Sequence, residues 1–149
     1  MVLDGSWCNP IVMAPTLWLG FMGDYEKLKV WEKAHALTCK IYRVAETLPP
    51  RHQYIIGDQL RRAALSIGTN IVEGSGRNHD GHFRNSLTMA LGEANEVHYL
   101  LLVVSDVGVL STNVTAPLRA LADEVRRMIA GLMDSVRQRG RPTTKKARA

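Results

Sequence analysis

The sequence predicts an all-α protein, an antiparallel up-down four-helix bundle that assembles into a closed homo-oligomer. Four segments carry apolar residues at alternating steps of three and four, the spacing of one helical face, and short loops separate them. No segment shows the alternation of a strand. With 149 residues, of which 46% are hydrophobic and 22% charged, the chain is expected to form one globular domain with a sizeable core.

Residues 1–23 differ from the rest of the chain. They are largely apolar, but Pro10 and Pro15 interrupt them, they are too short to span a bilayer, and they lack the basic start of a signal peptide. A further methionine, Met22, stands directly before the first helical pattern. We therefore expect residues 1–23 to be a poorly ordered extension or the product of an upstream start codon. The bundle is assigned to residues 24–137, with no membrane partner.

The first two helices are predicted on either side of a proline pair. The first covers residues 25–47, where apolar residues step by four and three along one face, and Pro49–Pro50 stops it. The second covers residues 52–73 and has an apolar seam of the same kind. Because glycine tolerates a positive φ, Gly74 and Gly76 are expected to end this helix in that conformation.

Beside its apolar seam, the second helix carries a polar line of amide, hydroxyl, guanidinium and carboxylate groups. An ordinary surface helix would hold interchangeable Lys and Glu there, so this composition indicates specified hydrogen bonds. Arg62 is expected to form a bidentate pair with Glu96 of the third helix, whereas Arg61, about 100° away, is expected to face outward. We predict a buried network that fixes helix register and contributes to the subunit interface. It comprises Gln59, Arg62, Ser66, Asn70, Glu73 and Glu96.

The third helix is predicted over residues 79–107, after a glycine-rich linker, and the fourth over residues 115–137, with Pro117 in its first turn. The stretch Tyr99–Val104 is apolar on more than one face. A helix of an isolated bundle needs one buried stripe, so this surplus indicates contact with another subunit; the alternative is a helix deeper in the core. The seam of the fourth helix is expected to comprise Leu118, Leu121, Val125, Met128, Leu132 and Val136.

The net charge of +5 is concentrated at the C-terminus. Residues 137–149 contain six cations and no acid, which leaves 13 Lys and Arg against 14 Asp and Glu elsewhere, a charge of −1. We expect residues 138–149 to be a disordered basic tail, which either binds polyanions or only solubilises the chain. The candidate nucleic-acid contacts are Arg51, Arg61, Arg77, Arg84, Arg137, Arg139, Arg141, Lys145, Lys146 and Arg148.

No constellation of residues indicates catalysis. The sequence lacks a P-loop and a nucleophile with a base and an orienting group. A dimetal bundle needs two ExxH pairs, and Glu32–His35 stands alone. His79 and His82, beside the linker, are expected to be solvated rather than bound to a metal or phosphate. We expect no enzymatic activity, no metal and no cofactor. Two distant cysteines give no sign of an oxidising compartment, so the expected location is the cytoplasm.

Two stretches of the chain resemble a known family. The opening YEKLKVWEKA and the core LRRAALSIGTNIVEGSGR, together with Gly92 and Glu96, resemble the 23S rRNA intervening-sequence family of four-helix bundle proteins over about residues 24–135. The resemblance implies a small bacterial protein, encoded within rRNA genes or standing alone, often a closed pentamer and without established enzymatic activity. The family is similar in fold to the accessory variability determinant of diversity-generating retroelements, which implies nucleic-acid binding and a reverse transcriptase as partner.

These observations lead to one functional expectation and one alternative. We expect a non-enzymatic, homo-oligomeric bundle that binds RNA or DNA weakly and without reading sequence, as an accessory to an rRNA intervening sequence or to a reverse transcriptase. Because the chain outside the tail has charge −1, the tail and the bundle arginines must supply most of the phosphate contacts. The alternative is a protein-interaction scaffold with no nucleic-acid role.

Overall fold

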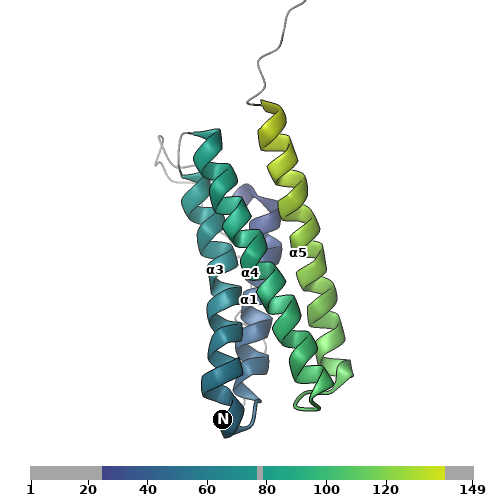
Figure 1. The fold of residues 1–149 in the computed structure, drawn as a ribbon. Helices are drawn as coiled ribbons and strands as arrows, with labels where there is room; N and C mark the ends of the chain where they lie inside the picture. Colours follow the sequence, from purple (N-terminus) through teal and green to yellow (C-terminus); the bar gives the residue numbers. More distant parts are fainter. Residues whose placement is uncertain (1–24, 77–78, 140–149) are drawn as a thin grey trace, which may run out of the picture.

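The computed structural model describes residues 25–76 and 79–139, and in these ranges it contains helices and no strand. Four long helices run antiparallel in turn (Figure 1): α1 (Lys29–Glu46), α3 (Asp58–Ser75), α4 (Asp80–Asp106) and α5 (Thr112–Arg139). Each packs against its neighbours in sequence, and α5 packs back on α1. The predicted up-down four-helix bundle is therefore confirmed, and it places α4 diagonally opposite α1.

The apolar seams form most of the core as predicted, although Val44, Ile56 and Phe83 are only half-buried. The fully buried side chains include Leu37 and Ile41 of α1, Leu60, Ile67 and Ile71 of α3, and Leu87, Val97 and Leu101 of α4. In α5 the prediction is partly wrong, because Ala122 and Ile129 are buried while Leu121 and Met128 are only half-buried. A straight helix has 3.6 residues per turn, so its buried stripe drifts away from a strict seven-residue repeat.

A π-helical turn joins the first two helices. After α1, the short α2 (Pro50–His52) leads into the π-helical segment η3 (Gln53–Gly57) and then directly into α3. Gln53 fixes this corner, because its side-chain Nε2 donates to the carbonyl oxygens of Leu48 at 2.8 Å and Glu46 at 3.2 Å. The predicted second helix is thus a single helical run that starts close to its expected position and contains a wider turn. Residues Tyr25–Lys27 form a 3₁₀ turn, η2, before α1.

Two sequence-based expectations about helix ends are wrong. Gly74 lies buried inside α3, and Gly76 caps the helix with φ −79°, so neither adopts a positive φ. A Cβ on Gly74 would lie 2.7 Å from Cβ of Ser86 and 2.8 Å from Cδ2 of Phe83. Gly74 is therefore required for the close approach of α3 and α4, whereas Gly108, between α4 and α5, does adopt φ 71°.

The fourth helix begins earlier than predicted. Ser111 accepts hydrogen bonds from the backbone N–H groups of Val114 and Thr115, so α5 starts at Thr112 and Pro117 lies beyond its first turn. Proline has no N–H, so the helix lacks one internal hydrogen bond there. None of the helices in the described ranges is both long and apolar enough to cross a membrane.

Candidate nucleic-acid interface

The antiparallel topology divides the predicted phosphate-binding arginines between the two ends of the bundle. Arg84, in the first turns of α4, and Arg137, in the last turn of α5, lie at the end where α3 meets α4, the upper end in Figure 1. Arg51 and Arg61 lie at the other end, where α2 and η3 connect α1 to α3. The 27 residues of α4 separate these ends, a distance of about 40 Å at 1.5 Å per residue.

The upper end, which we call the basic end, is defined by Arg84, Arg137 and the start of the C-terminal tail at Arg139. The side chains of Arg84 and Arg137 are both exposed. A shallow hollow of about 590 Å³ is lined by His79, Gly81, His82, Arg84 and Asn85 at the first turns of α4. The two histidines are exposed, as predicted, with ring centroids 6.1 Å apart. Two exposed arginines, one from α4 and one from α5, are therefore available to solvent at this end, beside the exposed carboxylate of Asp80.

Five of the predicted contacts lie outside the described residues. They are Arg77, Arg141, Lys145, Lys146 and Arg148. The predicted extension at residues 1–23 also lies outside them, as does all but the first part of the predicted tail.

Arg61 and Arg62 differ in exposure from what was expected, although Arg62 lies beside its expected partner Glu96. The Arg61 side chain is only 22% exposed, and its Nη1 donates to Oδ1 of Asp58 at 2.8 Å while Nη2 donates to Oε1 of Gln53 at 2.8 Å. Arg62 is 69% exposed. The expectation of an outward Arg61 is wrong because the π-helical turn brings Gln53 within its reach. Arg61 thus holds the corner of the bundle, and its guanidinium already has two partners.

The polar line of α3 is not one buried network. Arg62 lies 3.5 Å from Glu96 Oε1, as the predicted pairing requires, and also donates to Gln59, but one nitrogen makes both contacts, so the pair is not bidentate. Asn70 Nδ2 donates to the carbonyl of Ser66 at 2.8 Å and to its Oγ at 3.1 Å.

Glu73 is exposed and makes no hydrogen bond or ion pair with the other residues of the line in the described part of the chain. The line lies about 100° from the apolar seam, at the rim of the α3–α4 contact, where water reaches it.

A groove between α1 and α3 was not predicted from the sequence. It has a volume of about 400 Å³ and is lined by Trp31, His35, Thr38, Leu65, Gly68, Thr69, Val72 and Glu73. At its floor, the Thr38 hydroxyl lies 2.8 Å from the carbonyl oxygen of Ala64 and ties the two helices together. A Cβ on Gly68 would meet no atom within 4 Å, and Leu65 is 50% exposed. The available signal was a glycine in the interior of a helical pattern.

The histidines and carboxylates of the described residues make local contacts, among them the pair of His98 Nε2 and Asp123 Oδ2 at 3.6 Å. The His35 ring stacks on Trp31 with centroids 5.3 Å apart and lies 3.6 Å from Cys39 Sγ, while Glu32 pairs with Lys29 at 3.1 Å. Among the described residues, no group of three or more His, Cys, Asp or Glu is placed to hold a metal ion.

Comparisons with known proteins agree with this architecture. The family model of the 23S rRNA-intervening sequence protein matches residues 26–131. A crystal structure of a protein of unknown function from the S23 ribosomal protein family of Bacteroides thetaiotaomicron superposes with a TM-score of 0.66 at 22% identity, covering 70% of this chain and 97% of that one. At this identity the likeness concerns the fold alone. No curated protein matches the chain.

Proposed function

This chain belongs to the 23S rRNA-intervening sequence protein family, and from that premise we propose that it is a non-enzymatic, self-associating bundle that binds RNA or DNA weakly through its basic end. The observation that carries the proposal is that exposed cations from two helices, Arg84 of α4 and Arg137 of α5, lie at the same end of the bundle. The family's name supports an rRNA intervening sequence as the biological context.

The charge distribution supports binding without sequence readout. Arginines that contact only phosphates supply charge but no sequence information. Residues 137–149 hold six cations, while the rest of the chain has charge −1. One copy would therefore bind weakly, and self-association would raise the avidity by presenting several basic ends together.

The test compares charge reversals at the two ends of the bundle. We expect Arg84→Glu and a chain truncated after Val136 to weaken binding to labelled RNA and single-stranded DNA in fluorescence anisotropy. Each lost phosphate contact should lower the slope of log Kd against log salt by about 0.7–0.9. Arg51→Glu, an equally exposed arginine at the other end, is the matched control and should leave binding unchanged. Equal binding by all variants would contradict the proposal.

A protein-interaction scaffold is the second candidate, and one observation favours it. At the π-helical turn, far from the basic end, Tyr54 is 84% exposed and Ile55 is 71% exposed. Large apolar side chains gathered at one exposed turn are typical of protein contacts, and π-helical turns often mark functional sites. Absence of measurable binding of the full chain to either nucleic acid at low salt would favour this alternative.

A further inference from the structure

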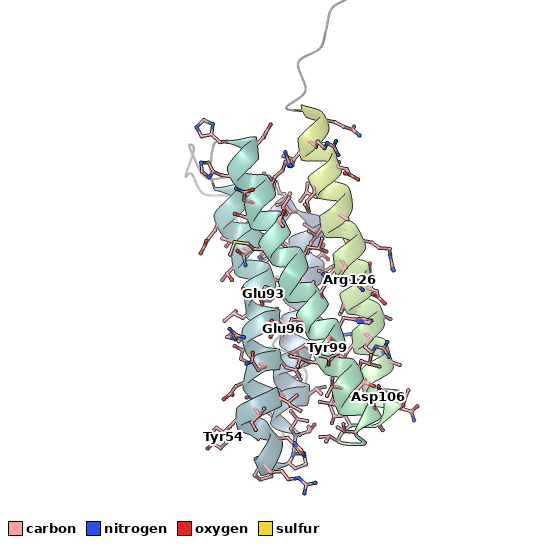
Figure 2. The ribbon with its side chains drawn as sticks, in the orientation of Figure 1. Tyr54, Glu93, Glu96, Tyr99, Asp106 and Arg126 are labelled. Atoms are coloured by element: carbon pink, nitrogen blue, oxygen red, sulfur yellow. The ribbon has the colours of Figure 1, made fainter. Side chains whose placement is uncertain are left out.

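Arginines follow the contact between α4 and α5 as well as the basic end. Three of them lie on α5 at spacings of seven and eleven residues, which at about 100° per residue puts them within about 20° of one line. With one neighbour on α5 and one residue of α4 they form what we call the arginine track: Arg84, Arg119, Arg126, Arg127 and Arg137. In Figure 2, Arg126 lies on the near side of α5, where α4 runs alongside.

One contact fixes the level of α4 against α5. Nε2 of His98 on α4 lies 3.6 Å from Oδ2 of Asp123 on α5. Because the two helices are antiparallel, equal counts of residues from this pair toward the basic end reach equal levels. The same count of fourteen leads to Arg84 on α4 and to Arg137 on α5, so these two arginines lie level with each other. From Arg137 the track continues down α5 to Arg119, a distance of about 27 Å at 1.5 Å per residue.

A hollow between α4 and α5 agrees with this register. It has a volume of about 350 Å³ and is lined by Leu91, Asn95, Asp123, Arg126, Arg127 and Ala130. Asn95 and Arg126 are level by the same count, as are Leu91 and Ala130, and all four line the hollow. Midway along the track the hollow therefore combines one amide and two guanidinium groups, donors that suit phosphate oxygens.

The chain leaves donors of the track arginines unused. Nη1 of Arg126 donates to Oδ1 of Asp123 at 2.6 Å. However, Nε of Arg126 and Nε of Arg119 are buried and have no hydrogen-bond partner among the described residues. Arg127 is exposed and forms no ion pair within the same ranges. A guanidinium has five N–H donors, so an approaching phosphate can accept hydrogen bonds that no described residue accepts.

The two flanks of α4 differ in charge. On the α3 flank lie the carboxylates of Glu93 and Glu96, and Glu96 contacts Arg62 there (Figure 2). On the α5 flank, four carboxylates lie among the track arginines or beyond the two ends of the track: Asp80, Asp106, Asp123 and Asp134. Only two of them, Asp123 and Asp134, lie between its ends. Positive charge therefore exceeds negative charge along the track.

We propose that the phosphate backbone of a nucleic-acid strand lies along the arginine track, from the basic end down the α4–α5 contact to Arg119. The inference rests on the proposed function and deepens it, because it extends the site from the end of the bundle onto one flank. Contacts of this kind hold the strand by charge and read no bases. With one phosphate per about 3.4 Å of strand, the track would accommodate about eight nucleotides.

Two matched alanine variants test the middle of the track. Arg127→Ala removes an exposed cation from it, whereas Arg62→Ala removes an exposed cation at a similar height on the α3 flank. We expect Arg127→Ala to weaken binding of the full chain to a labelled eight-nucleotide DNA strand several-fold at low salt. The slope of log Kd against log salt should fall by about 0.7, the share of one phosphate contact. Arg62→Ala should change neither quantity, and circular dichroism should show the same helix content in both.

Strand length tests how far the track extends. A four-nucleotide strand covers about 14 Å, so when it is seated at the basic end it does not reach Arg119. We expect Arg119→Ala to weaken binding of the eight-nucleotide strand more than that of the four-nucleotide strand. An equal effect on both lengths would refute the extended path. Arg119 is half-buried, so thermal unfolding of this variant checks that the bundle remains folded at the temperature of the binding measurement.

The remaining outcomes separate this inference from the proposed function. If Arg84→Glu weakens binding while Arg127→Ala and Arg119→Ala do not, the track is refuted and the basic end remains the site. Equal weakening by Arg127→Ala and Arg62→Ala would show attraction to net charge alone and would also refute the track. If the full chain binds neither RNA nor single-stranded DNA at low salt, both the track and the proposed function are refuted.

Discussion

Gly68 and Gly74 lie on the same helix, less than two turns apart, and they have opposite roles. At Gly74 the flank of α3 is closed, since a Cβ there would overlap Ser86 and Phe83 of α4. At Gly68 the flank is open, and a Cβ would enter the α1–α3 groove without meeting another atom within 4 Å. The comparison shows that a helical glycine either permits internal contact or leaves a surface for external contact, and only the neighbouring helix decides which.

The largest expected effect comes from filling the closed flank. Gly74→Ala places a Cβ 2.7 Å from Cβ of Ser86, and that atom is held close to the backbone of α4, so the two helices must separate. We expect a loss of about 1–3 kcal/mol in the free energy of unfolding, the usual cost of overpacking, measured by urea denaturation. Repeating the measurement at two protein concentrations separates folding from association. Stability equal to that of the natural chain would show that the helices separate without cost.

The double variant Gly74→Ala with Ser86→Gly is the control for this prediction. Removing Cβ of Ser86 eliminates the closest contact, although the overlap with Cδ2 of Phe83 at 2.8 Å remains. The effect of Ser86→Gly alone is first subtracted from the loss in free energy of unfolding of the double variant. If the remainder is smaller than the loss caused by Gly74→Ala, the strain lies at the contact between Gly74 and Ser86. An equal penalty would instead assign it to Phe83.

The second prediction extends the comparison to the two neighbouring arginines. Arg61 is 22% exposed and makes two hydrogen bonds at the π-helical corner, whereas Arg62 is 69% exposed and makes a rim contact with Glu96. We expect Arg61→Ala to lower the free energy of unfolding by about 1–2 kcal/mol, since it leaves Oε1 of Gln53 without its donor. Arg62→Ala should cost about 0–0.5 kcal/mol, as exposed pairs contribute little. Thermal unfolding of both variants measures the difference in stability. Equal losses of stability would contradict the structural role given to Arg61.

Features that depend on the helical periodicity of a segment could be predicted from the sequence. Features that depend on the distance between two packed helices could not. The core positions Leu60, Ile67 and Ile71 follow from helical spacing, and the Arg62–Glu96 pairing from the register of two seams. The role of Gly74 depends on how closely α4 approaches, which no spacing within α3 encodes. The partly buried position of Arg61 was missed because the five-residue π-helical turn before α3 brings Gln53 within its reach. Because neighbouring helices run antiparallel, Arg51 and Arg84 lie at opposite ends of the bundle. A grouping of the predicted phosphate-binding arginines by charge alone misses this separation.

A small effect of opposite sign, a gain in stability, is expected at the open side of α3 around Gly68. Gly68→Ala replaces a helix-interior glycine without any overlap, so the folded monomer should gain about 0.5–1 kcal/mol from the reduced entropy of the unfolded chain. Gly131→Ala, in similarly open surroundings on α5, should give a comparable gain in urea denaturation of dilute protein. At higher protein concentration the stabilities of the two variants must differ if Gly68 contacts a second copy, because a methyl group at Gly68 narrows the α1–α3 groove and weakens association. Equal gains at every concentration would mean that the open flank is only a solvated surface.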